Sequence, residues 1–343
     1  MRKRLVATWL AAALALACGR GDPSGRGGAL RLGHFPNVTH AQALYGRATG
    51  SFERGVGVPI AWTQFNAGPS AVEALFAGAV DASYLGPNPA INGYIRSQGR
   101  SFVIVAGAAS GGAALVVRPD AGILTESDFH GRTVATPQLA NTQDVAARLW
   151  FAARGYTTRE RGGDLTILPL ANPDQLLMFG KHQIDAAWTV EPWVSRLEQE
   201  GGGRVFLDEK QLWPGGRYVT ALLVVRRAFL AAHRDLVVKL VAAHVDATRA
   251  LNADLDASAG VLAAEVARET ASPMPARIVR SALGRIELGW DPLQGALAKA
   301  AGDAHRVGFL REAPDLGGIV EAGPLEEVLA AKGLPPLPRG PRP

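Results

Sequence analysis

The chain has 343 residues, of which 48% are hydrophobic and 20% charged; this suffices for about two packed domains and excludes a disordered chain. Its formal net charge is +5, and setting aside Arg2, Lys3 and Arg4 of the N-terminal segment leaves 33 basic against 31 acidic residues, or +2. The basic residues are scattered along the chain, which argues against a nucleic-acid-binding function based on charge.

The N-terminus predicts an export signal. Residues 2–4 are basic, residues 5–17 are apolar and too few to span a membrane, and Cys18 follows. The run Leu-Ala-Leu-Ala-Cys resembles a bacterial lipobox, with Ala15 where leucine is usual, so we expect lipidation at Cys18. A plain secretory signal with an incidental cysteine is the alternative. This one cysteine excludes an intramolecular disulfide and a cysteine-based metal cluster.

Strand and helix patterns alternate after a glycine-rich leash, and alternation of this kind predicts a parallel α/β architecture. The expected strands are 30–33, 58–64, 81–84 and 102–107, and the expected helices between them are 39–49 and 70–76. Residues 69–89 then match residues 173–193 at an offset of 104, and residues 32–39 match residues 135–142 at an offset of 103. This internal repeat predicts two similar lobes.

Two nearly identical apolar runs, 113–117 and 220–225, flank the second lobe and predict a two-stranded hinge. Helices at 236–252, with His244, Thr248 and Asn252 on one face, and at 257–269 are expected to return to the first lobe. The predicted organisation is a signal peptide (1–17), an anchor and flexible leash (18–29), lobe I (30–113 and 222–332), lobe II (114–221) and a disordered tail (333–343).

Loops at the carboxyl ends of the expected strands carry neutral polar residues and glycines, with a single acid among them. Such loops, next to helix N-termini, favour a small anion held by dipoles in a cleft between the lobes. The candidate ligand-binding residues are His34, Phe35, Asn37, His40, Phe65, Asn66, Pro87, Asn88, Ser110, Gln138, Asn141, Thr142, Gln143, Trp188 and Glu191.

Simpler interpretations stand beside this one. Asn37, Asn66 and Asn88 suit ordinary turns, and Thr142 suits a helix cap. His34 and His40 lack a recognised metal-ligand spacing, so no metal is expected. Glu191 either accepts bonds from a ligand amine or ring nitrogen, or pairs with an arginine across the lobes.

No catalytic motif accompanies these loops: a nucleophile elbow, a phosphate loop and a metalloprotease motif are all missing from the sequence. No histidine is placed in the sequence relative to Ser110 so as to suggest that it activates Ser110 as a nucleophile. We therefore expect a binding protein without catalytic residues or cofactor.

Several of these motifs together resemble the solute-binding proteins of ABC importers for nitrate, sulfonates, taurine and bicarbonate. The similarity covers about residues 30–330, and its motifs are FNAGP (65–69), EALFAGAVD (73–81), GPNPAIN (86–92), ATPQLANTQDV (135–145) and EPW (191–193). The resemblance implies a two-lobed periplasmic-binding-protein-like fold of the second type, whose lobes close on the ligand. It also implies an ABC permease and its ATPase as partners.

The resemblance leaves the ligand open. The acid-poor loops favour a sulfonate-like or other small oxyanion, whereas Trp188 with Glu191 would suit a heteroaromatic nutrient such as a thiamine pyrimidine precursor. The related thiamine-pyrimidine synthase is an enzyme on the same fold, but it lacks an export signal. The expected protein is a monomeric, lipid-anchored binding protein in the periplasm or on the outer face of the cytoplasmic membrane.

Overall fold

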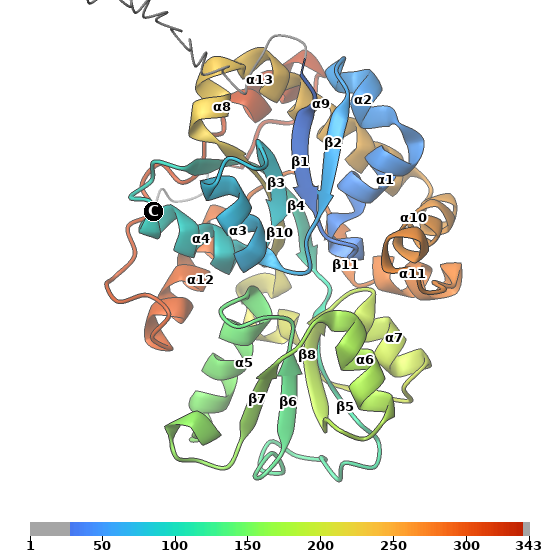
Figure 1. Cartoon of the computed structure of the whole chain (residues 1–343), viewed down its shortest axis with the longest axis vertical. Coiled ribbons are helices and arrows are strands. Elements are labelled where there is room, and N and C mark those ends of the chain that lie inside the picture. Colours follow the sequence, from blue (N-terminus) through green and yellow to red (C-terminus); the bar gives the residue numbers. More distant parts are fainter. Residues whose placement is uncertain (1–27, 339–343) are drawn as a thin grey trace, which may run out of the picture.

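The computed structural model describes residues 28–338, so the predicted signal peptide, Cys18, nearly all of the leash and residues 339–343 lie outside it. The described residues form two β-sheets, one above the other in Figure 1, each covered by its own helices. We call the part built on the six-stranded sheet lobe I and the part built on the five-stranded sheet lobe II.

The lobe I sheet has the strand order β11-β4-β10-β3-β1-β2. Its strands are β1 (Leu30–His34), β2 (Ile60–Gln64), β3 (Ala82–Leu85), β4 (Phe102–Gly111), β10 (Val219–Arg226) and β11 (Ile286–Leu288). β1 pairs parallel to β2 and β3, whereas β10 runs antiparallel to β3 and β4. The long apolar strand β4 is buried along almost its whole length, and β2 at the edge is half-exposed, as expected for a central and an edge position.

The lobe II sheet has the order β7-β6-β8-β5-β9. Its strands are β5 (Ala113–Val117), β6 (Thr133–Thr136), β7 (Thr166–Pro169), β8 (Ala186–Val190) and β9 (Arg204–Asp208). β7 and β8 pair parallel to β6, and β5 runs antiparallel to β8 and β9. The arrangement β7-β6-β8 therefore repeats β2-β1-β3, which explains the internal sequence repeat.

Helices cover both faces of each sheet. Lobe I contains α1 (Ala41–Thr49), α2 (Ser51–Val56), α3 (Gly68–Phe76), α4 (Pro87–Arg96), α8 (Arg227–Ala232), α9 (Arg234–Ala253), α10 (Leu255–Thr270), α11 (Ala276–Leu283), α12 (Gln294–Arg306) and α13 (Gly323–Ala331). Lobe II contains α5 (Thr142–Ala152), α6 (Asn172–Gly180) and α7 (Trp193–Gln199). Short 3-10 helices are η1 (Val38–His40), η2 (Arg159–Arg161), η3 (Glu209–Leu212) and η4 (Pro214–Gly216).

The apolar core forms on both sides of the two sheets. In lobe I, one cluster draws on α1, α2, α9, α10, α11 and α13 and another on α3, α4 and α12. In lobe II, α5 covers one face, and α6 with α7 covers the other. α9 and α10 do pack on lobe I, where the sequence placed them.

The chain passes from lobe I to lobe II between β4 and β5. Gly111 and Gly112 have φ angles of 81° and 78°, a left-handed conformation that glycine adopts without steric penalty. A Cβ on Gly112 would lie 2.6 Å from Cγ1 of Ile286, so a side chain would also clash there. Two adjacent glycines thus make this crossing.

The chain returns through residues 209–218, before β10. The expected hinge strands each lie within one sheet, β5 in lobe II and β10 in lobe I, and the crossings are the segments beside them. β10 starts at Val219 because that residue already pairs with Ser110 of β4, so the predicted lobe boundary at residue 222 is three residues late.

The predicted disordered tail differs from the structure over its first half. Leu334 and Leu337 are partly buried against the lobe I core, and the Leu334 N–H donates to the Leu329 carbonyl at 2.9 Å. Their apolar side chains outweigh the proline-rich composition that predicted a loose end.

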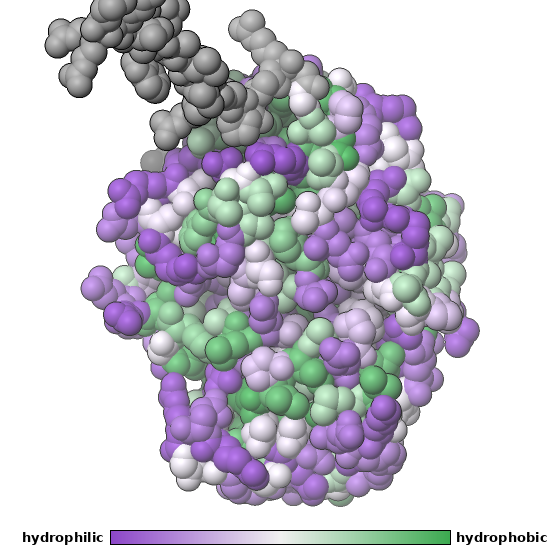
Figure 2. Space-filling model, viewed as in Figure 1, coloured by the Kyte–Doolittle hydropathy of each residue, from purple (hydrophilic) through white to green (hydrophobic). Residues whose placement is uncertain are grey.

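In the view of Figure 2, hydrophilic residues cover much of the surface of both lobes, and hydrophobic residues form smaller patches among these hydrophilic residues. Between residues 28 and 338, no helix combines the length and the apolar character that crossing a membrane requires.

Candidate ligand-binding site

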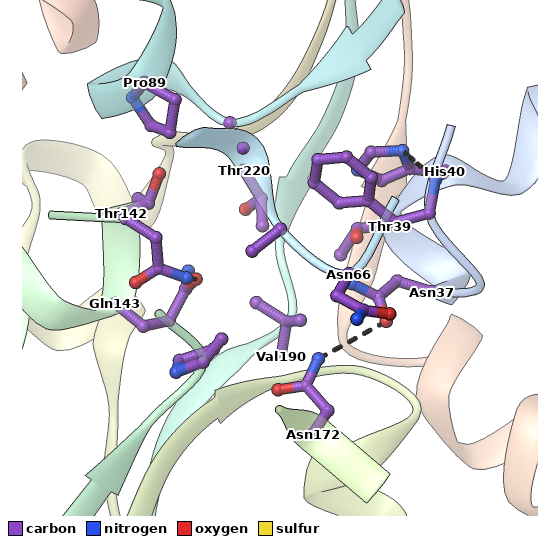
Figure 3. A pocket seen from close by; sticks show the side chains of 16 residues that line it. Asn37, Thr39, His40, Asn66, Pro89, Thr142, Gln143, Asn172, Val190 and Thr220 are labelled. Carbon is purple, nitrogen blue, oxygen red and sulfur yellow. Dashed lines mark hydrogen bonds between the residues drawn. The ribbon is translucent and has the colours of Figure 1, made fainter. Parts of the chain in front are cut away.

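A small cavity lies between the lobes at the carboxyl ends of β1, β2, β3, β6 and β8. Figure 3 shows side chains from both lobes converging on it. Its volume is about 30 Å³, so the two lobes already lie close around it. The lining residues are Phe35, Asn37, Thr39, His40, Asn66, Ala67, Gly68, Gly86, Pro89, Pro137, Asn141, Thr142, Gln143, Asn172, Val190 and Thr220.

Four helices begin at this cavity: α3 and α4 from lobe I, and α5 and α6 from lobe II. Three of them, α3, α4 and α6, carry proline in their first turn, where a missing N–H breaks no helical bond. The first N–H groups of a helix have no partner within it, and the helix dipole is positive there. The cavity is therefore surrounded by partial positive charge.

A chain of hydrogen bonds orients the amides at the start of α5. The Asp144 N–H donates to Oδ1 of Asn141 at 2.9 Å, which fixes the Asn141 oxygen, and Asn141 Nδ2 donates to Gln143 Oε1 at 3.3 Å. Gln143 Nε2 and Thr142 Oγ1 are buried and find no partner within residues 28–338. Buried donors of this kind are normally satisfied, so they are free for a ligand.

His40 contributes a neutral ring. Its Nδ1 accepts a hydrogen bond from the Phe35 N–H at 3.3 Å, and its ring stacks on Phe35 with 4.3 Å between centroids. Burial, together with nearby His34, lowers the pKa of His40 to about 3. Since a backbone N–H can only donate, Nδ1 is unprotonated, and the ring proton is on Nε2.

None of the lining residues is Asp, Glu, Lys or Arg, and His40 is neutral. The cavity therefore offers hydrogen-bond donors and helix N-termini without any formal charge. Such a site suits a ligand group that only accepts hydrogen bonds and carries negative charge, as an oxyanion does.

Thr142 of lobe II lies against Gly86 of lobe I. A Cβ on Gly86 would be 2.5 Å from Thr142 Oγ1, so only glycine allows this approach. Nearby, Gln138 Nε2 lies 3.4 Å from Ser70 Oγ. The start of α5 thus closes directly onto lobe I.

On another side, a charged cluster joins the lobes. Arg285 of lobe I donates through Nη1 to Glu191 Oε1 at 2.8 Å and Ser195 Oγ at 3.1 Å, and through Nη2 to Glu198 Oε2 at 2.6 Å. Burial raises the pKa of Glu191, and the bonds from Arg285 and Ser195 oppose that rise. We call Arg285, Glu191, Ser195 and Glu198 the Arg285 clasp. It decides between the two sequence interpretations of Glu191 in favour of the arginine.

The structure places seven of the fifteen predicted site residues around the cavity: Phe35, Asn37, His40, Asn66, Asn141, Thr142 and Gln143. Eight lie outside its lining: His34, Phe65, Pro87, Asn88, Ser110, Gln138, Trp188 and Glu191.

His34 and Trp188 are buried in other places. His34 Nε2 lies 2.6 Å from Oε1 of Glu269 in α10, so its ring is paired within lobe I and does not line the cavity. Trp188 belongs to the lobe II core and donates through Nε1 to Glu209 Oε2 at 2.8 Å. Trp188 and Val190 project from the same face of β8. Val190 reaches the cavity because it is the last residue of the strand, whereas Trp188 lies two residues earlier, within the lobe II core.

The remaining predicted residues lie close by with other partners. Asn88 Nδ2 is 3.4 Å from the Ala300 carbonyl, and Ser110 Oγ accepts from the Tyr218 N–H at 3.2 Å. Phe65 packs beside the lobe I core, and Pro87 is buried as the first residue of α4. These residues lie in or next to the predicted loops, but their side chains do not line the cavity.

Two lining residues, Asn172 and Thr220, lie outside every loop that the sequence singled out. Asn172 lies one residue before the repeat segment 173–193, and extending the offset of 104 by that residue would have matched it to Gly68 at the start of α3. Thr220 comes from β10 and donates to the Gly111 carbonyl at 2.6 Å. No sequence motif marks it.

Comparison with known proteins gives consistent results. A model described as the NMT1-like family matches residues 27–267. The taurine-binding periplasmic protein of Escherichia coli (strain K12) is 26% identical over 214 residues, which are 62% of this chain and 64% of that protein. The alignment therefore spans less than two thirds of that relative's length.

Solved structures share the fold at lower identity. The alkanesulfonate-binding protein SsuA from Xanthomonas axonopodis pv. citri, bound to MOPS, has a TM-score of 0.71 at 21% identity, covering 86% of this chain and 98% of that one. The periplasmic nitrate-binding protein NrtA from Synechocystis PCC 6803 has a TM-score of 0.76 at 15% identity, covering 91% and 92%. The predicted periplasmic-binding-protein-like fold of the second type is confirmed.

Proposed function

Since the chain belongs to the NMT1-like family, we propose that it is the solute-binding protein of an ABC importer and captures a small oxyanion between lobes I and II. One observation carries this proposal: the cavity presents buried, unpartnered donors, Thr142 Oγ1 and Gln143 Nε2, at helix N-termini and contains no charged side chain. A group that only accepts hydrogen bonds complements such a site.

The ligand class that fits best is a compact oxyanion, namely an aliphatic sulfonate, nitrate, taurine or bicarbonate. The small cavity suits the head group, and relatives named for taurine, alkanesulfonates and nitrate support the class. The cavity lining has no carboxylate that could pair with the ammonium group of taurine, so sulfonates without an amine are favoured. The heteroaromatic alternative rested on Trp188 and Glu191, which face elsewhere.

In the proposed mechanism, the lobes separate by motion at the Gly111–Gly112 crossing and at residues 209–218. The anion enters the open cleft, and closure brings Thr142 and Gln143 of lobe II onto it beside the donors of lobe I. We propose that the chain is exported, held at the membrane through lipidated Cys18, acts as a monomer, and delivers its ligand to an inner-membrane permease with its ATPase.

The test is thermal unfolding of the full chain, purified in mild detergent and freed of carried-over ligand, with methanesulfonate, ethanesulfonate, taurine, nitrate, bicarbonate and an aminopyrimidine. A ligand at 100 times its Kd stabilises the fold by about 2.7 kcal/mol, which is readily seen as a rise in Tm. We expect an oxyanion to produce this rise.

A pair of matched variants makes the test specific to the cavity. Gln143→Glu replaces a free donor with a carboxylate and should abolish the rise, whereas Gln183→Glu adds the same charge at an exposed position and should not. A rise with the aminopyrimidine alone, or an equal response in both variants, would contradict the proposal.

A further inference from the structure

Asn37 of lobe I is held by two residues of lobe II. Its Oδ1 accepts a hydrogen bond from Trp193 Nε1 at 2.9 Å, and Asn172 Nδ2 lies 3.5 Å from the same oxygen. Figure 3 marks the second of these contacts with a dashed line. Trp193, the first residue of α7, is 1% exposed, and Asn37 is 6% exposed, so water does not compete for these bonds.

The chemistry of the indole decides which way the Asn37 amide faces. An indole N–H donates and cannot accept, so the oxygen of the amide must lie on the Trp193 side. The rotated amide would set two donors against each other in a buried place. Asn37 Nδ2 therefore lies on the opposite side of the amide, and it has no hydrogen-bond partner among the described residues.

Asn172 strengthens the same orientation. Its Oδ1 accepts from Thr189 Oγ1 at 3.1 Å, which leaves its amino group for Asn37 Oδ1. The Trp193 indole, which can only donate, sets the orientation of Asn37, and Asn172 with Thr189 completes a consistent chain of donors and acceptors. This arrangement exists only while the lobes are together.

We propose that Trp193 is a positioning residue for ligand selection: it fixes Asn37 so that the closed cavity presents an amide donor to the ligand. The proposal rests on the proposed function and extends it to specificity. Two residues of the EPW motif then act at the lobe junction: Glu191 belongs to the Arg285 clasp, and Trp193 orients Asn37.

A sulfonate and a sulfonamide of the same size distinguish this role from mere packing. Methanesulfonate only accepts hydrogen bonds, whereas methanesulfonamide carries an amino group that would meet Asn37 Nδ2. Wild type should strongly prefer methanesulfonate. Without the Trp193 N–H, the Asn37 amide can rotate by 180° together with that of Asn172, because Thr189 Oγ1 can accept as well as donate. Asn37 then presents its oxygen, so the preference should shrink.

The experiment measures the affinities of full-length wild type, Trp193→Phe and Trp188→Phe for both compounds by calorimetry. Trp188→Phe is the matched control, because it also removes a buried indole N–H, in this case one that donates to Glu209 outside the cavity. We expect the sulfonate-to-sulfonamide preference to fall about tenfold in Trp193→Phe and to stay unchanged in Trp188→Phe. An unchanged preference in both would overturn the proposal.

A second variant covers failure of Trp193→Phe to fold. Asn37→Asp keeps the size of the side chain and its bond with Trp193 but places an acceptor towards the cavity, so it should lose methanesulfonate and retain methanesulfonamide. Retention of the wild-type preference in Asn37→Asp would overturn the proposal.

A ligand-free arm separates this proposal from the proposed function. Hydrogen exchange of the tryptophan indole protons, followed by NMR, should be slow at Trp193 in wild type and faster in Asn37→Ala, with Trp188 unchanged. If wild type binds none of the oxyanions, the proposed function fails, while this exchange still tests the Trp193–Asn37 bond. Equal Trp193 exchange in wild type and Asn37→Ala would overturn the positioning role.

Discussion

The cavity and the Arg285 clasp meet at adjacent residues at the end of β8, yet the cavity lining is uncharged and the clasp is built from charged side chains. Val190 lines the cavity, whereas the next residue, Glu191, is fully buried against Arg285. The cavity lining contains no charged side chain, whereas the clasp contains one cation and two carboxylates. Formal charge is thus used to hold the lobes together, and dipoles are used to meet the ligand.

This division has a physical reason. A cation in the small cavity would be buried without a partner whenever the ligand is absent, and unpaired buried charge is strongly unfavourable. Neutral donors and helix N-termini carry a smaller desolvation penalty and still attract an anion. The charges of the clasp always have their partners within the closed chain.

The largest expected effect comes from breaking the clasp. Arg285→Ala leaves Glu191 buried without its cation, at a penalty of about 3 kcal/mol, and opening of the lobes is the easiest way to hydrate that carboxylate. We expect small-angle scattering of the ligand-free chain to show a more open molecule. Ligand affinity should fall about 100-fold, the factor that corresponds to this energy.

Arg217→Ala is the matched control for the clasp. Arg217 pairs with Glu287, and both side chains are about half-exposed, so its loss should change stability by less than about 1 kcal/mol. If Arg285→Ala and Arg217→Ala scatter alike and bind alike, the clasp does not hold the lobes together.

The next effect is expected from a buried carboxyl, Glu209, that has indole donors in place of a cation. Glu209 accepts from Trp188 Nε1 at 2.8 Å and Trp213 Nε1 at 3.4 Å, and burial raises the pKa of Glu209 to about 7. Between pH 4.5 and 7 the folded chain retains a proton that the unfolded chain has released. Stability therefore falls as pH rises through this window, by on the order of 3 kcal/mol.

Glu209→Gln removes this titration and isolates it from that of other buried groups. The unfolding free energy of the variant, relative to wild type, should increase from pH 5 to pH 8 in urea titrations. Glu312→Gln, at an exposed position, should show no such increase. An equal pH dependence in Glu209→Gln and wild type would mean that Glu209 is ionised throughout.

The smallest expected effect distinguishes two residues that each lie at a helix start, Thr142 of α5 and Asn88 of α4. Thr142 Oγ1 is buried, unpartnered and in the cavity lining, whereas Asn88 contacts the Ala300 carbonyl. Thr142→Ala should weaken binding of the preferred oxyanion about tenfold, or ~1.4 kcal/mol, and Asn88→Ala should leave it within twofold. Calorimetry that finds equal losses would place both side chains at the ligand.

Much of the fold was predictable because its signals are local. The alternation of short apolar runs with helical patterns identified β1, β2, β3 and β4, and the repeat at an offset of 104 placed α3 over α6. A strand followed by a polar loop and a helix start brings that loop to the carboxyl edge of the sheet, whatever the rest of the chain does. The sequence alone therefore determined the two lobes and the loops between them.

The direction of each side chain was decided by tertiary structure. His34, Trp188 and Glu191 belong to the predicted loops or strand ends, yet they pair with Glu269, Glu209 and Arg285, partners that no local pattern indicates. The Asn37 amide is oriented by Trp193, 156 residues away. Sequence patterns report the burial and spacing of neighbours, whereas these orientations depend on donors and charges that meet only when the two lobes pack together.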